Sequence, residues 1–408
     1  MKYLKHLDIS GFDSRLPTYI TEFYNLQTLR VRNLRLKNLR GKLKLYGLNE
    51  VTDIEEAGKA KLCEKSYIQL LVLHWSINCD RNTIRIREYN DEDVMKGLEP
   101  RPNLKGLKIV EYMGKKFASW ITKMTNLVKI TLRDCISCEI FPPLGHLPKL
   151  REMKIKNMYS AKVIGSNVCG CIDTRAPKTV TTLYPSLTKL TLHNMTKLEE
   201  WLEPVMSTEG EDVSTVLSFP ELEVLMIKDC PSLRKIPNSC FPSLKKLKIR
   251  DLQSSMIVEM MSRKARSLTS LWLENISDGG GRGTFCLSMD SMVNKLLKNN
   301  SQSLTFLALG KCKSLACLNL GLSLQELRVY SPDLMRIILV KGSVGLKHVS
   351  IGQCLSFPSD RVFAQSQSST LVTLKLGPFL QKLDEFPWPC PSSMIPFPNL
   401  IELSYSAN

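Results

Sequence analysis

The stretch that decides the fold is Leu104-Lys105-Gly106-Leu107-Lys108-Ile109-Val110-Glu111-Tyr112, in which the first, fourth, sixth and ninth residues are apolar. The same spacing, L-x-x-L-x-L-x-x-φ with φ an apolar residue, cysteine or asparagine, returns along the chain. It begins at Leu4, Leu26, Leu104, Leu127, Leu150, Leu187, Leu222, Leu244, Leu268, Leu304, Leu324, Leu346, Leu371 and Leu400, with degenerate copies near Leu43 and Ile68. A chain built of such units is expected to be a solenoid, because each unit buries its apolar face against the next.

The spacing is that of a leucine-rich repeat. Leu104, Leu127 and Leu150 are 23 residues apart, which is enough for one short strand and a return segment. The L-x-L alternation is typical of a strand whose leucines face inward. We therefore predict an α/β leucine-rich-repeat solenoid, a horseshoe arc with a parallel β-sheet on its concave side. Irregular, 3-10 and short helical segments are expected on the convex side, where proline is frequent.

The repeats predict a single domain over residues 1–408, with about sixteen units. We expect N-terminal units over 1–38, a distinctive block over 39–150 and irregular repeats over 151–408. One helix is predicted near 52–65, because acidic residues begin this segment and lysines end it. Insertion loops are predicted near 165–182, 203–218 and 278–300, where the spacing between units lengthens and Gly, Pro or polar residues gather.

The sequence contains no pattern that predicts catalysis. There is no phosphate-binding P-loop, and the five histidines are dispersed without a nucleophile or carboxylate at a motif spacing. We therefore expect no enzyme activity and no cofactor.

Thirteen cysteines follow the repeat rather than a disulfide or metal pattern. Cys135, Cys230, Cys312 and Cys354 stand at ninth positions, where we expect a reduced side chain buried at the turn and within reach of backbone groups. The pairs Cys135/Cys138 and Cys169/Cys171 lack a second ligand pair, so no metal site is predicted.

The sequence also lacks a run of about 18 apolar residues, the length needed to cross a bilayer. Met1–Leu4 enters a repeat directly, which predicts that there is no signal peptide. We expect a protein without a membrane span, located in the cytoplasm or the nucleus.

The net charge of +17 can be assigned to a surface. Second, third, fifth, seventh and eighth positions of each unit should face solvent on the concave side, and there basic residues outnumber acidic ones. The candidate protein-binding residues are Lys105, Lys108, Lys129, Arg133, Lys154, Lys156, Lys189, Lys245, Lys246, Lys248, Arg250, Trp272 and Tyr330. The densest cluster is Lys245–Arg250. Such a surface attracts an acidic partner, although solvated strands can carry lysine merely for solubility.

Several longer motifs carry a family resemblance: Asn38–Val51 followed by Asp53–Ala57, Leu71–Trp75, Asp93–Leu104, Phe117–Trp120 and Phe141–Pro148. Together they resemble the leucine-rich repeat region of plant intracellular disease-resistance receptors of the coiled-coil, nucleotide-binding, leucine-rich-repeat (NLR) class. Residues 1–408 contain no counterpart of the nucleotide-binding module, so the resemblance brings no nucleotide site with it.

The resemblance implies a module that recognises a pathogen effector or a guarded host protein, or that restrains an NB-ARC-type nucleotide-binding module. A nucleic-acid-binding solenoid is an alternative, disfavoured because aromatic residues on the concave face are sparse (Trp272, Phe306, Tyr330). A ubiquitin-ligase substrate adaptor would need an F-box-like segment before the repeats. An extracellular receptor ectodomain would need a signal peptide.

Overall fold

The computed structural model describes residues 6–8, 28–31, 41–75, 90–165, 181–202, 216–237, 241–253, 255–276, 289–312, 315–321, 323–334, 336–339, 345–354, 370–380 and 399–406. The chain divides into two compact units, Met1–Pro220 and Glu221–Asn408, which we call unit 1 and unit 2.

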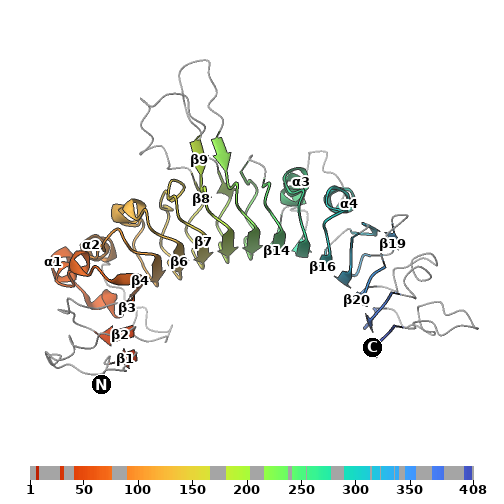
Figure 1. The fold of residues 1–408 in the computed structure, drawn as a ribbon, viewed down its shortest axis with the longest axis horizontal. Coiled ribbons are helices and arrows are strands. Elements are labelled where there is room, and N and C mark those ends of the chain that lie inside the picture. The colour runs from red at the N-terminus through yellow and green to blue at the C-terminus, as the bar shows by residue number, and fades with distance from the viewer. Residues whose placement is uncertain are drawn as a thin grey trace, which may run out of the picture. The chain divides into compact units, whose positions relative to one another are not determined.

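Unit 1 is built on a parallel sheet in which each strand pairs with the strand of the next repeat (Figure 1). Its strands are β1 (His6–Asp8), β2 (Thr28–Val31), β3 (Gly41–Leu45), β4 (Ile68–His74), β5 (Gly106–Val110), β6 (Lys129–Arg133), β7 (Glu152–Lys156) and β10 (Lys189–His193). Two short parallel pairs lie off this sheet. They join β8 (Val163–Ile164) to β11 (Glu200–Trp201) and β9 (Thr181–Leu183) to β12 (Val216–Ser218).

Unit 2 repeats this plan. Its parallel sheet contains β13 (Val224–Lys228), β14 (Lys246–Leu252), β15 (Ser270–Ile276), β16 (Phe306–Gly310), β18 (Glu326–Tyr330), β20 (His348–Gly352), β21 (Thr373–Leu376) and β22 (Glu402–Tyr405). A separate pair joins β17 (Cys317–Leu320) to β19 (Arg336–Leu339). The predicted leucine-rich-repeat solenoid with a parallel sheet is thus confirmed in both units.

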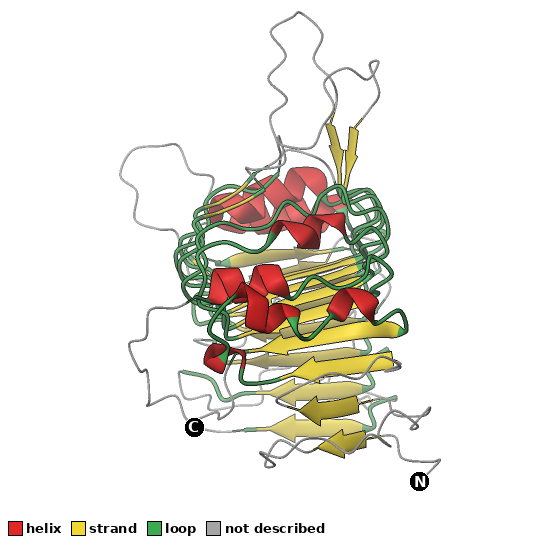
Figure 2. Cartoon of the chain, turned by 90° about the vertical axis from the view of Figure 1, so that its left-hand side faces the viewer, coloured by secondary structure: helices red, strands yellow, loops and turns green. Residues whose placement is uncertain are grey.

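Helices occupy return segments, on the side away from the sheet (Figure 2). They are α1 (Ile54–Gly58), α2 (Asp91–Gly97), α3 (Ser255–Lys264) and α4 (Met289–Asn299), with 3-10 turns η2 (Leu48–Glu50), η3 (Leu62–Glu64) and η4 (Ser119–Lys123). Among the described residues, no helix has the length and apolar character that crossing a membrane requires.

The structure corrects the prediction of one helix over 52–65. Asp53 caps α1 by accepting the N–H of Glu56 at 2.8 Å, but the helix ends at Gly58. Lys61 then adopts a left-handed conformation with φ 46°, and η3 follows as a separate turn. The acidic residues do mark the first turn of a helix, as predicted. The lysines that suggested a longer helix lie after its last residue, Gly58.

The insertion loops were also predicted too broadly. The segment predicted as a loop at 278–300 contains α4, whose buried residues include Met292, Val293 and Leu296. The ends of the other two insertions pair with each other as β9 and β12. Apolar residues at helical spacing in 289–299 were the missed signal. The single domain and the number of repeats stay predictions.

The core of each unit is the inward-facing half of its strands. Leu107 and Ile109 of β5 are buried, as are Leu247 and Ile249 of β14, and the residues between them face out. Since side chains alternate along a strand, every L-x-L places two residues in the core and leaves one outside. The predicted strand register is confirmed.

Most strands with the regular repeat spacing are followed or closed by a residue with a left-handed backbone, at the eighth position of the repeat. Glu111, Asp134, Asn157 and Asn194 have φ between 56° and 58°, and Asp229, Asp251 and Asn275 of unit 2 follow the same rule. Aspartate and asparagine tolerate this conformation better than most residues. The N–H of Asp134 donates to the carbonyl of Lys156 in the next repeat at 3.0 Å, and that of Asn157 donates to His193 at 2.9 Å.

Eighth-position side chains also bond across repeats. Asn157 Nδ2 donates to Asp134 Oδ1 at 2.5 Å, and Asn194 Nδ2 donates to Asn157 Oδ1 at 2.9 Å. In unit 2, Asn275 Nδ2 donates to Asp251 Oδ1 at 2.5 Å. These positions, which were predicted only to face solvent, form a polar ladder that links successive repeats.

The ninth-position cysteines behave as predicted. Cys135, Cys230, Cys312 and Cys354 are buried and reduced, and each thiol lies 3.2–3.6 Å from the carbonyl oxygen two residues earlier. Burial raises the pKa of Cys135 to about 12, so this thiol stays protonated and poorly nucleophilic.

An aromatic cluster fixes the junction between α2 and β5. Trp75 and Tyr112 meet edge to face with their ring centroids 4.9 Å apart. Beside them, Asp91 at the start of α2 is only 4% exposed and accepts the N–H of Met113 at 2.8 Å. Burial raises the pKa of Asp91 to about 6, against a smaller lowering by this hydrogen bond.

We predict that Leu247→Asp unfolds unit 2 or destabilises it severely. Truncating a buried leucine alone costs about 2–5 kcal/mol, and an unpaired carboxylate adds a desolvation penalty. Its neighbour Lys246 is exposed, so Lys246→Asp should change the free energy of unfolding by less than about 1 kcal/mol. Urea denaturation of the two variants measures the difference, and equal midpoints would show that the register is wrong.

We also predict a pH-dependent difference between the wild type and Asp91→Asn. The pKa of Asp91 rises from 3.8 to about 6 on folding, so the folded state binds more protons than the unfolded state between these values. Stability from this group is present at low pH and is lost as pH rises from about 4 to about 6. Denaturation curves over this range should show the free energy of unfolding of the wild type falling relative to that of the variant, by up to about 1.4 kcal/mol per pH unit. A constant difference would contradict the assignment.

Candidate protein-binding faces

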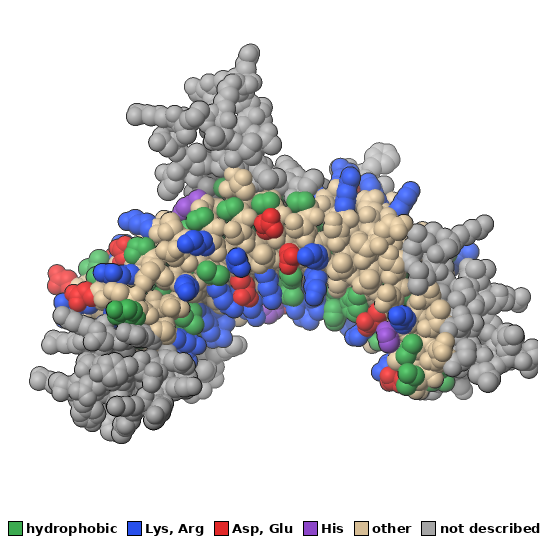
Figure 3. Space-filling view, viewed as in Figure 1, with side chains coloured by type: hydrophobic (Ala, Val, Ile, Leu, Met, Phe, Trp, Pro, Cys, Tyr) green, Lys and Arg blue, Asp and Glu red, His purple; other side chains and the backbone are tan. Residues whose placement is uncertain are grey.

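The outward side chains of unit 1 form a basic sheet face. One row across the register reads Lys44, Val72, Lys108, Thr131 and Lys154 on β3 to β7. We call the whole set the basic face; its members are Lys42, Lys44, Lys108, Lys129, Arg133, Lys154, Lys156 and Lys189. Lys and Arg side chains gather along the strand side of the chain, over β6 and β7 (Figure 3).

Part of the basic face is neutralised within the face itself. Glu152 accepts from Lys129 at 2.6 Å and from Lys154 at 2.9 Å. Partial burial alone would raise the pKa of Glu152, but the two lysines lower it to about 2. Arg133 pairs with Asp134 at 2.9 Å. These three predicted binding cations therefore have partners already.

The other part, over β3 to β5, lacks such compensation. Lys42, Lys44 and Lys108 form no ion pair with any described carboxylate. Burial lowers the pKa of Lys108, and the nearby charges of Arg133, Lys42 and Lys44 lower it further. Burial and then Lys44 likewise lower the pKa of Lys42. We call Lys42, Lys44 and Lys108 the lysine patch.

Apolar side chains lie among these lysines. In the register, Leu70 is opposite Lys42, Val72 is opposite both Lys44 and Lys108, and Val110 follows on β5. Sequence reasoning missed Lys42 and Lys44 because their repeat is degenerate. The alternation in Gly41-Lys42-Leu43-Lys44-Leu45 was the signal that could have found them.

In unit 2 two of the four cations of the predicted cluster Lys245–Arg250 are paired with carboxylates. Lys245 bonds Glu223 at 2.6 Å, and Arg250 bonds Asp251 at 2.8 Å and Asp229 at 3.4 Å. Lys246 and Lys248 have no ion pair with a described carboxylate. The densest cluster in sequence is therefore not the least compensated one in space.

The remaining predicted residues divide between the two units. Lys105 lies just before β5 and is exposed, while Lys156 and Lys189 lie on β7 and β10 without an ion pair to a described carboxylate. Trp272 and Tyr330 lie on the sheet face of unit 2, where Lys248 Nζ sits 3.1 Å from the centre of the Trp272 ring. Prediction named Trp272 and Tyr330 but did not foresee their contacts.

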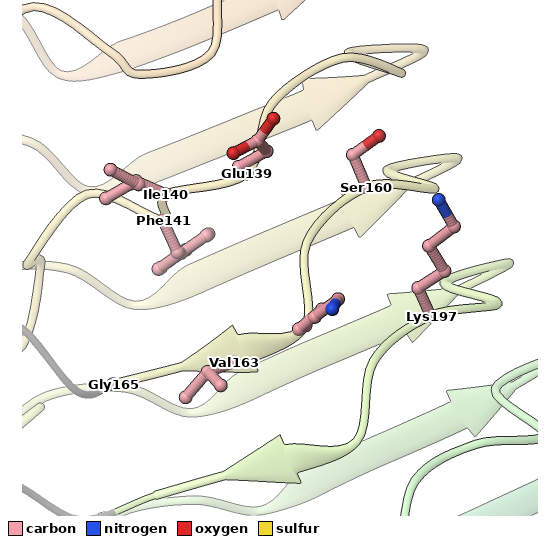
Figure 4. Close-up of a pocket in the computed structure, with 8 residues that line it drawn as sticks. Glu139, Ile140, Phe141, Ser160, Val163, Gly165 and Lys197 are labelled. Carbon is pink, nitrogen blue, oxygen red and sulfur yellow. The ribbon is translucent and has the colours of Figure 1, made fainter.

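A cleft of 510 Å³ lies off the main sheet of unit 1. Glu139, Ser160 and Lys197 lie along its edge, and Val163 of β8 lies beside it (Figure 4). Lys115 approaches Glu139 to 3.9 Å. This set of side chains includes no nucleophile paired with a base.

Among the residues that the structure describes, no three His, Cys, Asp or Glu side chains gather as a metal site would require. Cys135 and Cys138 are both buried, and their thiols lie near the carbonyls of Arg133 and Ile140. The pair Cys169/Cys171 lies outside the described residues.

The repeat register defines the class: both units are leucine-rich-repeat solenoids. Family models assign the repeats more closely, since residues 31–158 match the R13L1/DRL21 leucine-rich repeats and residues 103–256 match the repeats described as plant disease resistance protein RPS2-like. The chain has a leucine-rich repeat region of the kind found in plant disease-resistance receptors of the NLR class. No enzyme family is indicated by these matches.

Curated relatives agree. The chain is 32% identical to the putative disease resistance RPP13-like protein 1 of Arabidopsis thaliana over 52% of its own length and 20% of that protein. It is 30% identical to the putative disease resistance protein RGA4 of Solanum bulbocastanum over 58% of its length and 22% of that protein. The chain thus spans about a fifth of these relatives. A solved structure of the Drosophila Toll–Spätzle complex aligns with a TM-score of 0.45 and 14% identity, covering 98% of this chain and 43% of that one.

The lysine patch predicts that the pKa of Lys108 depends on its neighbours Lys42 and Lys44. Replacing Lys42 and Lys44 with methionine should raise the pKa of Lys108, because two neighbouring positive charges are removed while its burial is kept. NMR titration of isotopically methylated lysines reads the value directly. Lys162→Met, an exposed change beside the cleft, is the control and should leave Lys108 unaffected. An unchanged pKa in the double variant would mean that the patch does not exist in solution.

Proposed function

We propose that this chain is the protein-binding leucine-rich repeat module of a plant immune receptor, acting inside the cell. Its partner would be a pathogen effector, a guarded host protein or an NB-ARC-type nucleotide-binding module that it holds inactive. The similarity to plant disease-resistance proteins supports the defence role. The lysine patch is the single observation that supports an acidic protein surface as the partner.

The physical reason lies in uncompensated charge. The pKa of Lys108 is lowered first by burial and then by neighbouring cations. A carboxylate on a partner would stabilise the charged lysines and offset their mutual repulsion. The field of the patch also steers an acidic partner toward the face. Leu70, which is half-buried and lies opposite Lys42, offers apolar contact at the same place, which a purely electrostatic surface would lack.

Among the three partners, the nucleotide-binding module gives the sharpest test because it can be supplied in trans. The triple variant Lys42→Glu, Lys44→Glu, Lys108→Glu should weaken its binding at least about tenfold, which corresponds to about 1.4 kcal/mol. Binding by the wild type should weaken as salt rises, because the screening length falls from about 30 Å at 0.01 M to about 10 Å at 0.1 M. Biosensor titration at several salt concentrations measures both effects.

The matched control carries the same change in charge elsewhere on unit 1. Lys123, Lys162 and Lys197 are exposed and lie off the main sheet, so their triple reversal to glutamate should leave binding nearly unchanged. Equal losses of binding affinity in both triple variants would show that net charge alone, and not the lysine patch, causes the effect. Competition by duplex or single-stranded DNA at physiological salt would favour the alternative of a nucleic-acid-binding face.

A further inference from the structure

A second ladder of backbone hydrogen bonds lies off the main sheet of unit 1, along its return segments. One part of it places Lys116 opposite Ile140, whose N–H donates to the carbonyl of Lys115 at 3.2 Å. Another part joins β8 to β11, where Val163 lies opposite Glu200. In each part, the return segment of one repeat is thus paired with that of the next.

This second ladder is interrupted between its two parts. The repeats that carry Ile140 and Val163 do pair in the main sheet, where Lys129 of β6 lies opposite Glu152 of β7. An equal offset along the chain would place Ile140 opposite Val163. Among the described residues, however, no backbone hydrogen bond joins 139–141 to β8. The edge of β8 that faces away from β11 can therefore accept a further strand.

The cleft of 510 Å³ lies at this interruption. Glu139 and Ile140 line it from one repeat, Ser160 and Val163 from the next, and Lys197 from the repeat after that (Figure 4). The space is open to a ligand, because Ile140 is 47% exposed and Val163 is only half-buried. Its volume falls in the range of about 300–1,000 Å³ that is usual for ligand sites.

The charges around the cleft favour an acidic ligand. Lys162 and Lys197 both line it, are exposed, and form no ion pair with a described carboxylate. Ser160 adds a hydroxyl that can donate to an anion. Glu139 is the acidic residue among the described lining residues, and Lys115 approaches it to 3.9 Å. Two lysines therefore remain for the carboxylates of a ligand.

An extended peptide is the ligand that uses all of these features together. A nucleic acid or a small anion would contact the two lysines, but it would leave the free edge of β8 and the exposed side chain of Ile140 without a role. A peptide that adds a strand to a sheet edge gains main-chain hydrogen bonds, and its side chains provide specificity. Apolar side chains of such a peptide would cover Ile140 and Val163.

We propose that this cleft binds an extended segment of a partner protein, which pairs its main chain with the free edge of β8. Its acidic residues lie near Lys162 and Lys197, and the apolar residues that follow contact Ile140 and Val163. The site rests on the proposal that this chain binds proteins. It is separate from the lysine patch, which lies on the main sheet, and it recognises main chain and apolar side chains as well as charge.

The probe is a fluorescein-labelled peptide that contains two aspartates followed by valine, leucine and valine, and binding is measured by fluorescence polarisation. We expect saturable binding with a Kd below about 1 mM. The double variant Lys162→Met, Lys197→Met should weaken binding at least about tenfold, because it removes both cations and keeps most of each side chain. Ile140→Asp should weaken binding as strongly, whereas Ile140→Val should preserve it.

A modified peptide tests the main-chain pairing without any change to the protein. N-methyl groups on its valines and leucine remove the backbone donors and keep every side chain, so this peptide should not bind measurably. A scrambled peptide of the same composition should also lose affinity, although its net charge is unchanged.

Matched variants separate this cleft from general charge and from the lysine patch. Lys123 and Lys149 are exposed and do not line the cleft, so Lys123→Met with Lys149→Met should leave peptide binding unchanged. The triple reversal of the lysine patch should also leave it intact. Conversely, the cleft variants should keep their affinity for the nucleotide-binding module, so failure of one proposal can be told from failure of the other.

Any of three results would overturn the proposal. They are the absence of saturable binding up to about 1 mM, unchanged affinity in the double lysine variant, and equal binding of the N-methylated peptide. Displacement of the peptide by oligothymidylate at physiological salt would assign the cleft to nucleic acid instead. Thermal melts of the variants should match that of the wild type, since Ile140, Lys162 and Lys197 are exposed.

Discussion

Successive repeats can stack only if each strand alternates its side chains in phase with the next. In both units this phase is held by parallel pairing such as Leu107 to Ile130 and Leu247 to Leu271. A shift of one residue would exchange the buried and exposed halves of the strand. A left-handed residue at the eighth position of most repeats adds a second restraint, because its N–H extends the ladder by one hydrogen bond, as that of Asp134 does. Core, turn and outer face therefore depend on one register.

The same register determines which charges are free to act. Residues at corresponding positions lie about 4.8 Å apart on neighbouring strands, so a glutamate in one repeat neutralises lysines in its own and the adjoining repeat, as Glu152 does for Lys154 and Lys129. Where leucine and glycine take the place of that glutamate in its row, as Leu70 and Gly106 do, the charges of the lysine patch stay uncompensated. Net charge alone gives no information about this arrangement.

Strand positions, inward leucines and buried ninth-position cysteines could be predicted because each follows from the local spacing inside a repeat. Contacts between side chains of different repeats could not. The pairing of Arg250 with Asp229 and the placement of Lys248 over Trp272 join residues more than 20 positions apart. Local spacing does not specify the orientation of long side chains. Helix α4 was missed for another reason, since its long spacing between repeats was interpreted as an insertion loop.

In the degenerate repeats, residues of a candidate site can be overlooked when only the sequence is considered. Lys42 and Lys44 lie on a regular strand, yet the shortened spacing around them hid their outward positions. For the eighth positions the spacing predicted only exposure to solvent, and it did not reveal that Asp134 and Asn157 bond to each other across repeats. In each case the backbone conformation decided the outcome, and the residue type alone did not.

Disulfide crosslinking of β6 to β7 tests the register most directly. Thr131 and Lys154 are opposite each other on the outer face, and neighbouring strands are close enough for a disulfide, whose Cα atoms are usually 4.4–6.8 Å apart. Under mild oxidation, the double variant Thr131→Cys, Lys154→Cys should give one crosslinked peptide by mass spectrometry. Thr131→Cys with Met153→Cys should give none, because Met153 faces the core. A crosslink formed only by the second pair would contradict the register and the faces derived from it.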